Sequence, residues 1–180
     1  MMTTKIEKTN IVLIGFMGSG KTVVGRNLAN QLAYQFTDTD EEIRSVTGMS
    51  LPQLFRKHGE IRFRSEEDLV VKKLAQREHQ VIATGGSLTP IPANFELLHQ
   101  QGWFVLLSAD PAVILSRISR KNDRLLLCGK PDLPTLQKLV EEREQMYRQM
   151  ADYQINTTQI SVEEAARSIA ENYRRRVKVE

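Results

Sequence analysis

Short apolar segments separated by longer amphipathic stretches set the pattern of this sequence. Five segments have the length of strands: residues 10–15, 35–38, 80–84, 103–108 and 153–157. The first, third and fourth of them are nearly continuous apolar runs, which are typical of strands buried on both faces of a sheet. Helical periodicity between the segments, as from Lys21 to Ala33, indicates that the strands run parallel. The pattern therefore predicts an α/β fold with a five-stranded parallel sheet.

Two stretches interrupt this alternation of strands and helices. Residues 40–77 are polar and helical, and such a long helical insertion favours a substrate-binding region. Residues 120–134 combine clustered charges with glycine and proline and show no periodicity, which predicts a mobile lid before a helix over residues 136–150. The sequence contains no internal repeat, so we expect all 180 residues to form one domain with a core of about residues 10–174.

Composition narrows the class of protein. With 41% hydrophobic residues the chain can form a sizeable core. No apolar run approaches the roughly 18 residues of a membrane span, and residues 1–8 lack the apolar stretch of a signal peptide, so we expect a cytoplasmic protein. The net charge of +3 is spread along the chain apart from an arginine triplet at 174–176, which we expect at a solvated helix end and not on nucleic acid. The single Cys128 excludes an internal disulfide.

Residues 15–22 match the phosphate-binding pattern G-x-x-x-x-G-K-[ST], and they lie between a predicted strand and a predicted helix, as that pattern requires. Gly18 and Gly20 allow backbone N–H groups to surround phosphates, and the helix N-terminus adds positive potential. Lys21 can reach the terminal phosphates, and Thr22 can bind magnesium. The segment therefore predicts a P-loop that binds a nucleoside triphosphate.

Two acids, Asp38 and Asp40, lie at the end of the second predicted strand. In an extended segment, alternate residues share a face, so both carboxylates would lie on one side. One could bind magnesium and the other a substrate hydroxyl. Acids at this place can also serve simply as a helix cap, but a neighbouring P-loop in a parallel sheet favours the functional interpretation.

Three further groups of residues are ambiguous when each is taken alone. Residues 59–67 alternate in charge, which by itself predicts a solvated helix face rich in ion pairs. Residues 84–87 follow a strand and either bring backbone close to a ligand or form a simple tight turn. Several arginines and one tyrosine near the predicted lid could clamp anions or lie on the surface: Arg117, Arg120, Arg124, Arg143 and Tyr147.

Taken in order, these motifs resemble the shikimate kinase family. The P-loop, D-T-D, G-E-x-x-F-R-x-x-E, a glycine pair after a strand, an arginine before a leucine run, and R-x-x-x-Y occur in register from residue 10 to about residue 174. The resemblance implies a three-layer P-loop kinase fold. It also implies transfer of the γ-phosphoryl group of ATP, with Mg²⁺, to the 3-hydroxyl of shikimate, a step of chorismate and aromatic amino acid biosynthesis.

The resemblance also implies a role for each motif. ATP would contact the P-loop and two arginines: Gly18, Ser19, Gly20, Lys21, Thr22, Val23, Arg117 and Arg124. Thr22 and Asp38 would hold Mg²⁺, and Arg117 would stack on adenine. Shikimate would contact Asp40, Arg64, Gly85, Gly86 and Arg143, with Glu67 orienting the arginines. Lys21, Asp40 and Arg124 would be catalytic, with Asp40 helping to activate the attacking hydroxyl. A monomer acting on a small molecule is expected.

Two residues depart from the family pattern. Ser87 replaces a third glycine in the turn after the strand, and Leu125 replaces the proline after the lid arginine. Two alternatives therefore stay open: a kinase for another small hydroxylated acceptor, such as a gluconate-type substrate, and an ATP-binding regulator without turnover. A GTPase is not expected, because residues 120–123 do not supply the guanine signature Asn-Lys-x-Asp.

Overall fold

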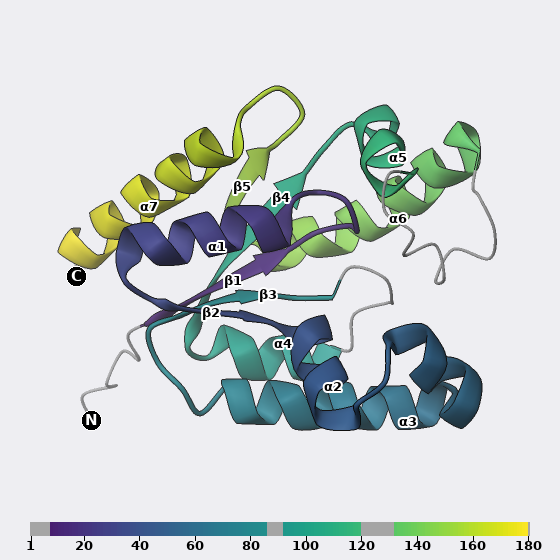
Figure 1. The fold of residues 1–180 in the computed structure, drawn as a ribbon. Coiled ribbons are helices and arrows are strands. Elements are labelled where there is room, and N and C mark those ends of the chain that lie inside the picture. Colours follow the sequence, from purple (N-terminus) through teal and green to yellow (C-terminus); the bar gives the residue numbers. More distant parts are fainter. Residues whose placement is uncertain (1–7, 86–91, 120–131, 180) are drawn as a thin grey trace.

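Five parallel strands form a single sheet in the computed structural model, which describes residues 8–85, 92–119 and 132–179 (Figure 1). The strands are β1 (Asn10–Ile14), β2 (Gln35–Asp38), β3 (Gln80–Ala83), β4 (Gly102–Ser108) and β5 (Tyr153–Asn156). Their order across the sheet is β2-β3-β1-β4-β5, and each neighbouring pair is parallel. The five predicted strands are thus confirmed, with bounds that differ by at most one residue at either end.

Helices cover both faces of the sheet. The described helices are α1 (Lys21–Leu32), α2 (Thr39–Thr47), α3 (Leu51–Leu74), α4 (Pro92–His99), α5 (Pro111–Ser119), α6 (Leu133–Met150) and α7 (Val162–Val179). In Figure 1, α1 and α7 lie side by side on one face, and α3 and α4 lie on the other. The architecture is therefore the three-layer α/β arrangement that the sequence predicts.

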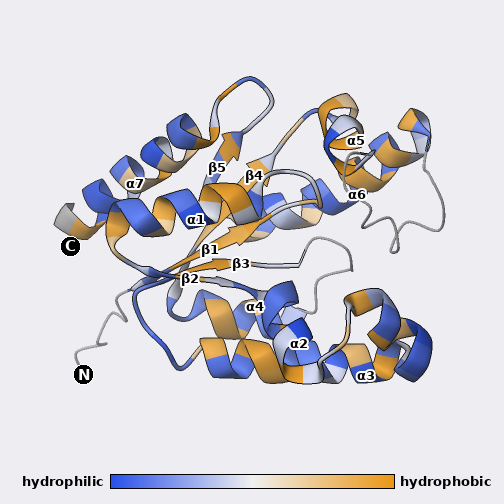
Figure 2. Cartoon of the chain, in the orientation of Figure 1, coloured by the Kyte–Doolittle hydropathy of each residue, from blue (hydrophilic) through white to orange (hydrophobic). Residues whose placement is uncertain are grey.

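The apolar run of β1 is continuous because both of its faces are buried. Ile11 and Leu13 pack toward α1 and α7, whereas Val12 and Ile14 pack toward α3 and α4. Figure 2 shows β1 as hydrophobic along its length, while the helices carry both hydrophobic and hydrophilic stripes. The helices therefore turn hydrophobic stripes toward the interior and leave hydrophilic stripes in solvent.

Local sequence signals set the helical insertion between β2 and β3. Ser50 caps α3 in a capping box with Gln53. Gly48 ends α2 with a φ of 65°, and Gly59 interrupts α3 with a φ of 75° and a ψ of −179°. Both conformations are costly for residues that carry a side chain, which explains why glycine stands at these two breaks. Gly59 therefore divides α3 into two helical parts that meet at a kink, and the second part starts at residue 60.

Two predictions about local structure are wrong. The helix expected from residue 136 begins at Leu133, because the side chain of Asp132 accepts a hydrogen bond from the Thr135 N–H and Pro134 lies in the first turn, where no N–H partner is needed. The predicted lid therefore ends before residue 133, and residues 120–131 of it lie outside the described part of the chain. The segment after Asp38 is also helical and not extended, because Asp38 itself caps α2.

Two other expectations concern the surface. Within the described residues, no helix is both long enough and apolar enough to cross a membrane. Arg174 and Arg175 are exposed near the end of α7, as expected for a solvated helix end.

The strand register brings three loops to one edge of the sheet. Asp38 of β2 pairs with Ala83 of β3, and Ala83 pairs with Leu13 of β1. The carboxyl ends of the three strands are therefore level. In parallel α/β sheets this edge is where ligands bind.

Candidate active site

The P-loop (residues 15–22) leaves the carboxyl end of β1 and enters α1. Gly18 and Gly20 have φ values of 79° and 103°, which residues with a Cβ rarely adopt. A Cβ on Gly18 would also lie 3.0 Å from the Cγ2 atom of Ile118. Gly20 is the N-cap of α1, so the free N–H groups of that helix start directly after the loop. The loop can therefore receive a phosphate group on backbone N–H donors.

Lys21 is buried and folded back over the P-loop. Its Nζ atom donates hydrogen bonds to the carbonyl oxygens of Gly15 at 2.7 Å and Phe16 at 3.0 Å. A phosphate would accept the same donors with a full negative charge and would therefore bind the ammonium group more strongly than these neutral carbonyls do. Lys21 is therefore held where phosphates enter the loop.

Asp38 divides its two carboxylate oxygens between two tasks. Oδ1 accepts hydrogen bonds from the N–H groups of Asp40 at 3.0 Å and Glu41 at 3.4 Å, and so caps α2. Oδ2 accepts a 2.8 Å hydrogen bond from the hydroxyl of Thr22. The helix-cap interpretation and the functional interpretation of this acid are thus compatible.

The oxygens of Thr22 and Asp38 fit a magnesium ion. Both are hard donors, and Mg²⁺ in phosphate-binding sites usually takes only one or two protein oxygens and keeps water or phosphate oxygens for the rest. In keeping with this, the described residues contain no group of three or more His, Cys, Asp or Glu side chains that could form a full protein cage for a metal. The pair can therefore contribute to a nucleotide-bound Mg²⁺ site.

Asp40 lies in the first turn of α2 and faces the loop after β3. A Cβ on Gly85 would lie 2.5 Å from Oδ1 of Asp40, so only a glycine leaves room for the carboxylate. The N–H of Gly85 donates a 2.8 Å hydrogen bond to the hydroxyl of Thr39, which ties the two loops together. Although the extended geometry expected for residues 38–40 is wrong, Asp40 still lies at the carboxyl edge of the sheet.

The pKa of Asp40 is raised to about 7. Burial is the main cause, and the negative charges of Asp38 and Glu67 add to it, while Lys21 and Arg44 act in the opposite direction. Desolvation penalises the charged carboxylate more than the neutral acid. Asp40 can therefore exchange a proton near neutral pH, as a general base must.

Arg64 is held on α3 by two acids. Its Nη1 donates to Oε2 of Glu67 at 2.8 Å, and weaker contacts of 3.4 Å reach Oε1 of Glu60. The side chain of Arg64 is 22% exposed. Burial raises the pKa of Glu67, whereas Arg64 lowers it. Glu67 therefore orients Arg64 without removing its capacity to bind another anion.

Arg143 and Tyr147 of α6 lie near the P-loop residue Phe16 and near Glu67 of α3. The guanidinium of Arg143 lies 5.2 Å from the ring centre of Phe16, a cation–π contact with the P-loop. The Tyr147 hydroxyl is buried and has no hydrogen-bond partner among the described residues. Burial raises its pKa, which Arg143 lowers and Glu67 raises. The charges of Arg143 on the same helix and of Glu67 on α3 therefore both lie close enough to Tyr147 to affect its pKa.

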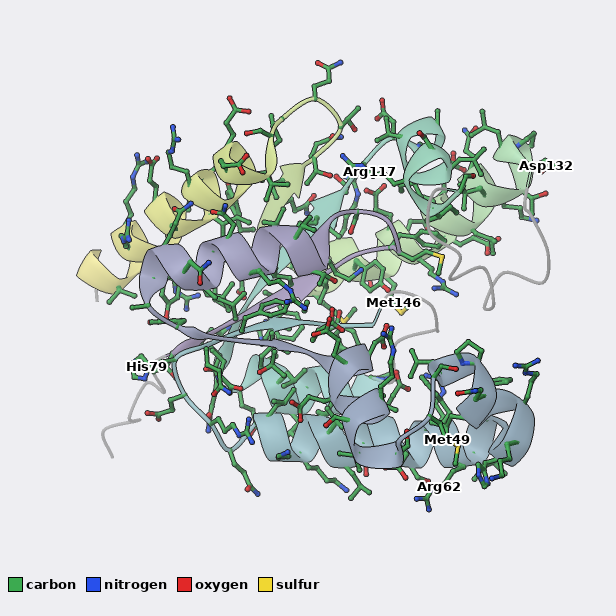
Figure 3. All side chains as sticks on the ribbon, in the orientation of Figure 1. Met49, Arg62, His79, Arg117, Asp132 and Met146 are labelled. Carbon is green, nitrogen blue, oxygen red and sulfur yellow. The ribbon has the colours of Figure 1, made fainter. Side chains whose placement is uncertain are left out.

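Arg117 of α5 lies on the other side of the P-loop, as Figure 3 shows. Its Nη1 donates to the carbonyl oxygen of Gly18 at 3.2 Å, and its Nη2 donates to the carbonyl oxygen of Thr157 at 2.8 Å. The predicted site residues thus form two groups around the loop: one with Asp40, Arg64 and Arg143, and one with Arg117.

Several predicted positions cannot be placed in this geometry. Gly86, Ser87, Arg120, Arg124 and Leu125 lie outside the described residues. Of the other predicted site residues, Val23 is 49% exposed on the first turn of α1, and Ser19 is fully buried beneath the loop.

Three residues near the site were missed by sequence reasoning. Thr39 bonds the loop after β3, Phe16 packs under Arg143, and Thr157 bonds both Arg117 and the P-loop. Phe16 occupies a variable position of the P-loop pattern, and Thr39 lies between the two acids of the D-T-D motif, so only their neighbours drew attention. Thr157 directly follows the short strand β5 and carries no local signal.

Comparison with known proteins gives a consistent result. A family model described as shikimate kinase matches residues 17–174. The shikimate kinase of Pelotomaculum thermopropionicum is 46% identical over 160 residues, which cover 89% of this chain and 92% of that protein. The shikimate kinase of Caldanaerobacter subterraneus subsp. tengcongensis is 43% identical over 91% of this chain and 95% of its own. The structure of shikimate kinase from Acinetobacter baumannii in complex with shikimate matches with a TM-score of 0.86 and 38% identity, covering 93% of this chain and 94% of that one.

Proposed function

The chain belongs to the shikimate kinase family, and on that basis we propose how its residues transfer the γ-phosphoryl group of ATP to the 3-hydroxyl of shikimate. The family is an ATP phosphotransferase of aromatic amino acid biosynthesis, and this chain has that activity. One observation carries the proposed arrangement of roles: a P-loop lysine, a threonine–aspartate pair and an acid with a pKa of about 7 meet at the carboxyl edge of the sheet.

ATP binds with its phosphates in the P-loop and its base toward Arg117. The N–H groups of Gly18, Ser19 and Gly20 and those at the start of α1 donate hydrogen bonds to the phosphate oxygens. Lys21 leaves the loop carbonyls that it bonds in the ligand-free chain and binds the terminal phosphates. Thr22 and Val23 complete the contact at the first turn of α1. Arg124, outside the described residues, is proposed as the lid arginine on the transferred group.

Thr22 and Asp38 are the residues that would hold Mg²⁺. When bound, the ion neutralises charge on the β- and γ-phosphates. The two oxygens that would serve it are already adjacent, at 2.8 Å. Little rearrangement of protein side chains is therefore needed when the nucleotide arrives.

Asp40 acts as the general base for the acceptor. In its ionised form it accepts a hydrogen bond from the reacting hydroxyl and then takes its proton as the phosphorus–oxygen bond forms. A pKa near 7 keeps this carboxylate basic enough to take a proton and still ionised in a large share of molecules at neutral pH. The absence of a Cβ on Gly85 lets the ring of the acceptor approach Asp40 closely.

The acceptor carboxylate lies between Arg64 of α3 and Arg143 of α6, and Gly85 and Gly86 give backbone contacts to the acceptor ring. Arginine suits this task because its planar donor fork matches a carboxylate. Glu67 fixes Arg64 from one side, and the ring of Phe16 supports Arg143. The clamp therefore selects small hydroxylated acids over neutral polyols.

A coupled assay tests the assignment directly. The protein with ATP, Mg²⁺ and shikimate is expected to release ADP, and mass detection should find one phosphate added to shikimate. A parallel panel with gluconate and other hydroxylated acids should give far lower kcat/KM values. Robust transfer to another acceptor with none to shikimate would contradict the proposed substrate, and tight ATP binding without transfer to any acceptor would indicate a regulator.

Replacing Arg64 by alanine should raise the KM for shikimate by at least about thirtyfold, because deleting one partner of a desolvated charge pair costs ~2 kcal/mol or more. The KM for ATP should change by less than about threefold, since Arg64 is held on α3 by Glu60 and Glu67 and is assigned to the acceptor. Steady-state kinetics with each substrate varied in turn measures both values.

Lys72→Ala is the matched control for that substitution. Lys72 is on the same helix, is 59% exposed, and pairs within the helix with Asp68. It should alter neither KM. If Arg64→Ala raised the KM for ATP alone, Arg64 would belong to the nucleotide site and the carboxylate clamp would be wrong.

A further inference from the structure

A single buried hydroxyl joins the base side of the nucleotide site to the P-loop. Thr157 lies directly after β5 and is 4% exposed. Its Oγ1 atom lies 2.9 Å from the carbonyl oxygen of Ser19, 3.1 Å from the carbonyl oxygen of Ser108, and 3.1 Å from Nη1 of Arg117. Three separate segments of the chain therefore meet at one side chain.

Hydrogen-bond accounting assigns the hydroxyl proton to Ser19. The carbonyl oxygen of Ser108 already accepts a 2.8 Å bond from the backbone N–H of Thr157. Arg117 can only donate, so Oγ1 must accept from it. The one remaining proton of the hydroxyl goes to the shorter contact, on the Ser19 carbonyl oxygen. Donation from the cation polarises the hydroxyl and strengthens the bond that it donates in turn.

This bond fixes the orientation of one peptide unit of the P-loop. The described peptide bonds are trans, so the N–H of Gly20 points away from the Ser19 carbonyl oxygen in the same plane. With that carbonyl turned toward Thr157, the Gly20 N–H is directed to the opposite side of the loop. Arg117 holds the preceding carbonyl, that of Gly18, at 3.2 Å. Two consecutive carbonyls are therefore turned outward, toward α5 and β5.

We propose that Thr157 is a positioning residue for the nucleotide, which sets the Ser19–Gly20 peptide for phosphate binding and couples it to Arg117 on the base side. The inference rests on the proposed function only in that ATP is taken to bind the P-loop with its base toward Arg117. Thr157 touches neither reacting atom. Its effect passes through the backbone of the loop and through the guanidinium that it holds.

Thr157→Val removes the hydroxyl and keeps the shape of the side chain. We expect the KM for ATP and the dissociation constant for ADP to rise about tenfold, the usual effect of one lost buried hydrogen bond. The KM for shikimate at saturating ATP should change by less than about twofold. Thr157→Ser restores the hydroxyl and should return the ATP values to within about twofold of the natural protein.

Tripolyphosphate separates the two halves of the proposal, because it offers phosphates without a base. Its inhibition constant against ATP should also rise in Thr157→Val, since the Gly20 N–H is no longer held. An unchanged constant, with weaker ADP binding, would restrict Thr157 to the base side and overturn the proposed coupling. Equal losses in the valine and serine variants would likewise overturn it, because they would mean that packing and not the hydroxyl matters.

Thr158→Val is the matched control. It makes the same change one residue later, where the hydroxyl accepts a 2.9 Å bond from the N–H of Asp110 and does not contact the P-loop. Its ATP and ADP constants should stay at the natural values. Absence of ATP binding in the natural protein would instead contradict the proposed function, so failure of that function and failure of this inference give different results.

Discussion

Lys21→Met is expected to lower kcat by about a thousandfold while the protein stays folded. The substitution keeps the buried apolar stem and removes the only charge that the P-loop helix brings directly to the terminal phosphates. Loss of one preorganised donor to developing charge costs about a hundredfold to a thousandfold in kcat, and a full positive charge in a dry site belongs at the upper end. The steady-state rate of ADP release at saturating ATP and shikimate measures the effect.

The ligand-free geometry of Lys21 adds a second expectation. Its ammonium group bonds the carbonyls of Gly15 and Phe16, so the methionine variant leaves these two acceptors without that donor. The melting temperature should therefore fall slightly and not collapse. Lys73→Met is the control, since Lys73 is 51% exposed and pairs with Glu42. A kcat for Lys21→Met within tenfold of the natural value would contradict the role of Lys21 in phosphoryl transfer.

The sequence alone predicts the sheet well because burial leaves a direct mark on composition. β1 is apolar from Ile11 to Ile14 and β4 from Trp103 to Leu107, because these residues are buried on both faces of the sheet. β2 is a weaker case, since only Thr37 of its four residues is buried, yet the two acids at its end, Asp38 and Asp40, marked that end correctly. The order of the strands could not be predicted, because it depends on which strands pair and not on any one segment.

The site was predicted by motif, and the structure corrects the local geometry. Residues 59–67 would, by charge pattern alone, be a solvated face. In the structure Phe63 is 1% exposed and Glu66 is 2% exposed, so this helix packs inward and carries Arg64 with it. The spacing of Asp38 and Asp40 was interpreted as an extended face, whereas a side chain that caps its own helix turns the chain at that point.

Contacts between distant segments left no signal in the sequence. Thr157 is separated from Ser19 by 138 positions, and Thr39 is separated from Gly85 by 46. A hydroxyl that bonds a backbone carbonyl, as Thr157 does, or a backbone N–H, as Thr39 does, requires no particular residue type at the other end. Such positioning residues become visible only when the fold places them side by side.

Asp40→Asn should lower kcat by about a hundredfold to ten-thousandfold, since a general base contributes on this scale. The activity of the natural protein should rise with pH through the neutral region as Asp40 loses its proton, and the asparagine variant should lack that rise. Asp68→Asn, an exposed acid paired with Lys72, is the control and should keep the natural pH profile. Initial rates measured from about pH 5.5 to about pH 9 at saturating ATP test this prediction.

The same substitution should make the ligand-free protein more stable at alkaline pH, and the sign follows from the pKa. The folded-state pKa of Asp40 is about 7 and its ordinary value is 3.8, so the folded protein binds the proton more tightly than the unfolded chain does. The stabilisation from this proton is complete below pH 3.8 and is lost as the pH rises through about 7. The loss amounts to at most ~4 kcal/mol at alkaline pH, and asparagine, which never ionises, avoids it. Denaturant unfolding at about pH 5 and about pH 8.5 should therefore show the variant gaining more stability relative to the natural protein at the higher pH than at the lower, because the natural protein loses the rest of this stabilisation between the two. If the variant lost activity but gained no stability there, Asp40 would be an ordinary ionised carboxylate, and its proposed role as a base tuned by burial would be wrong.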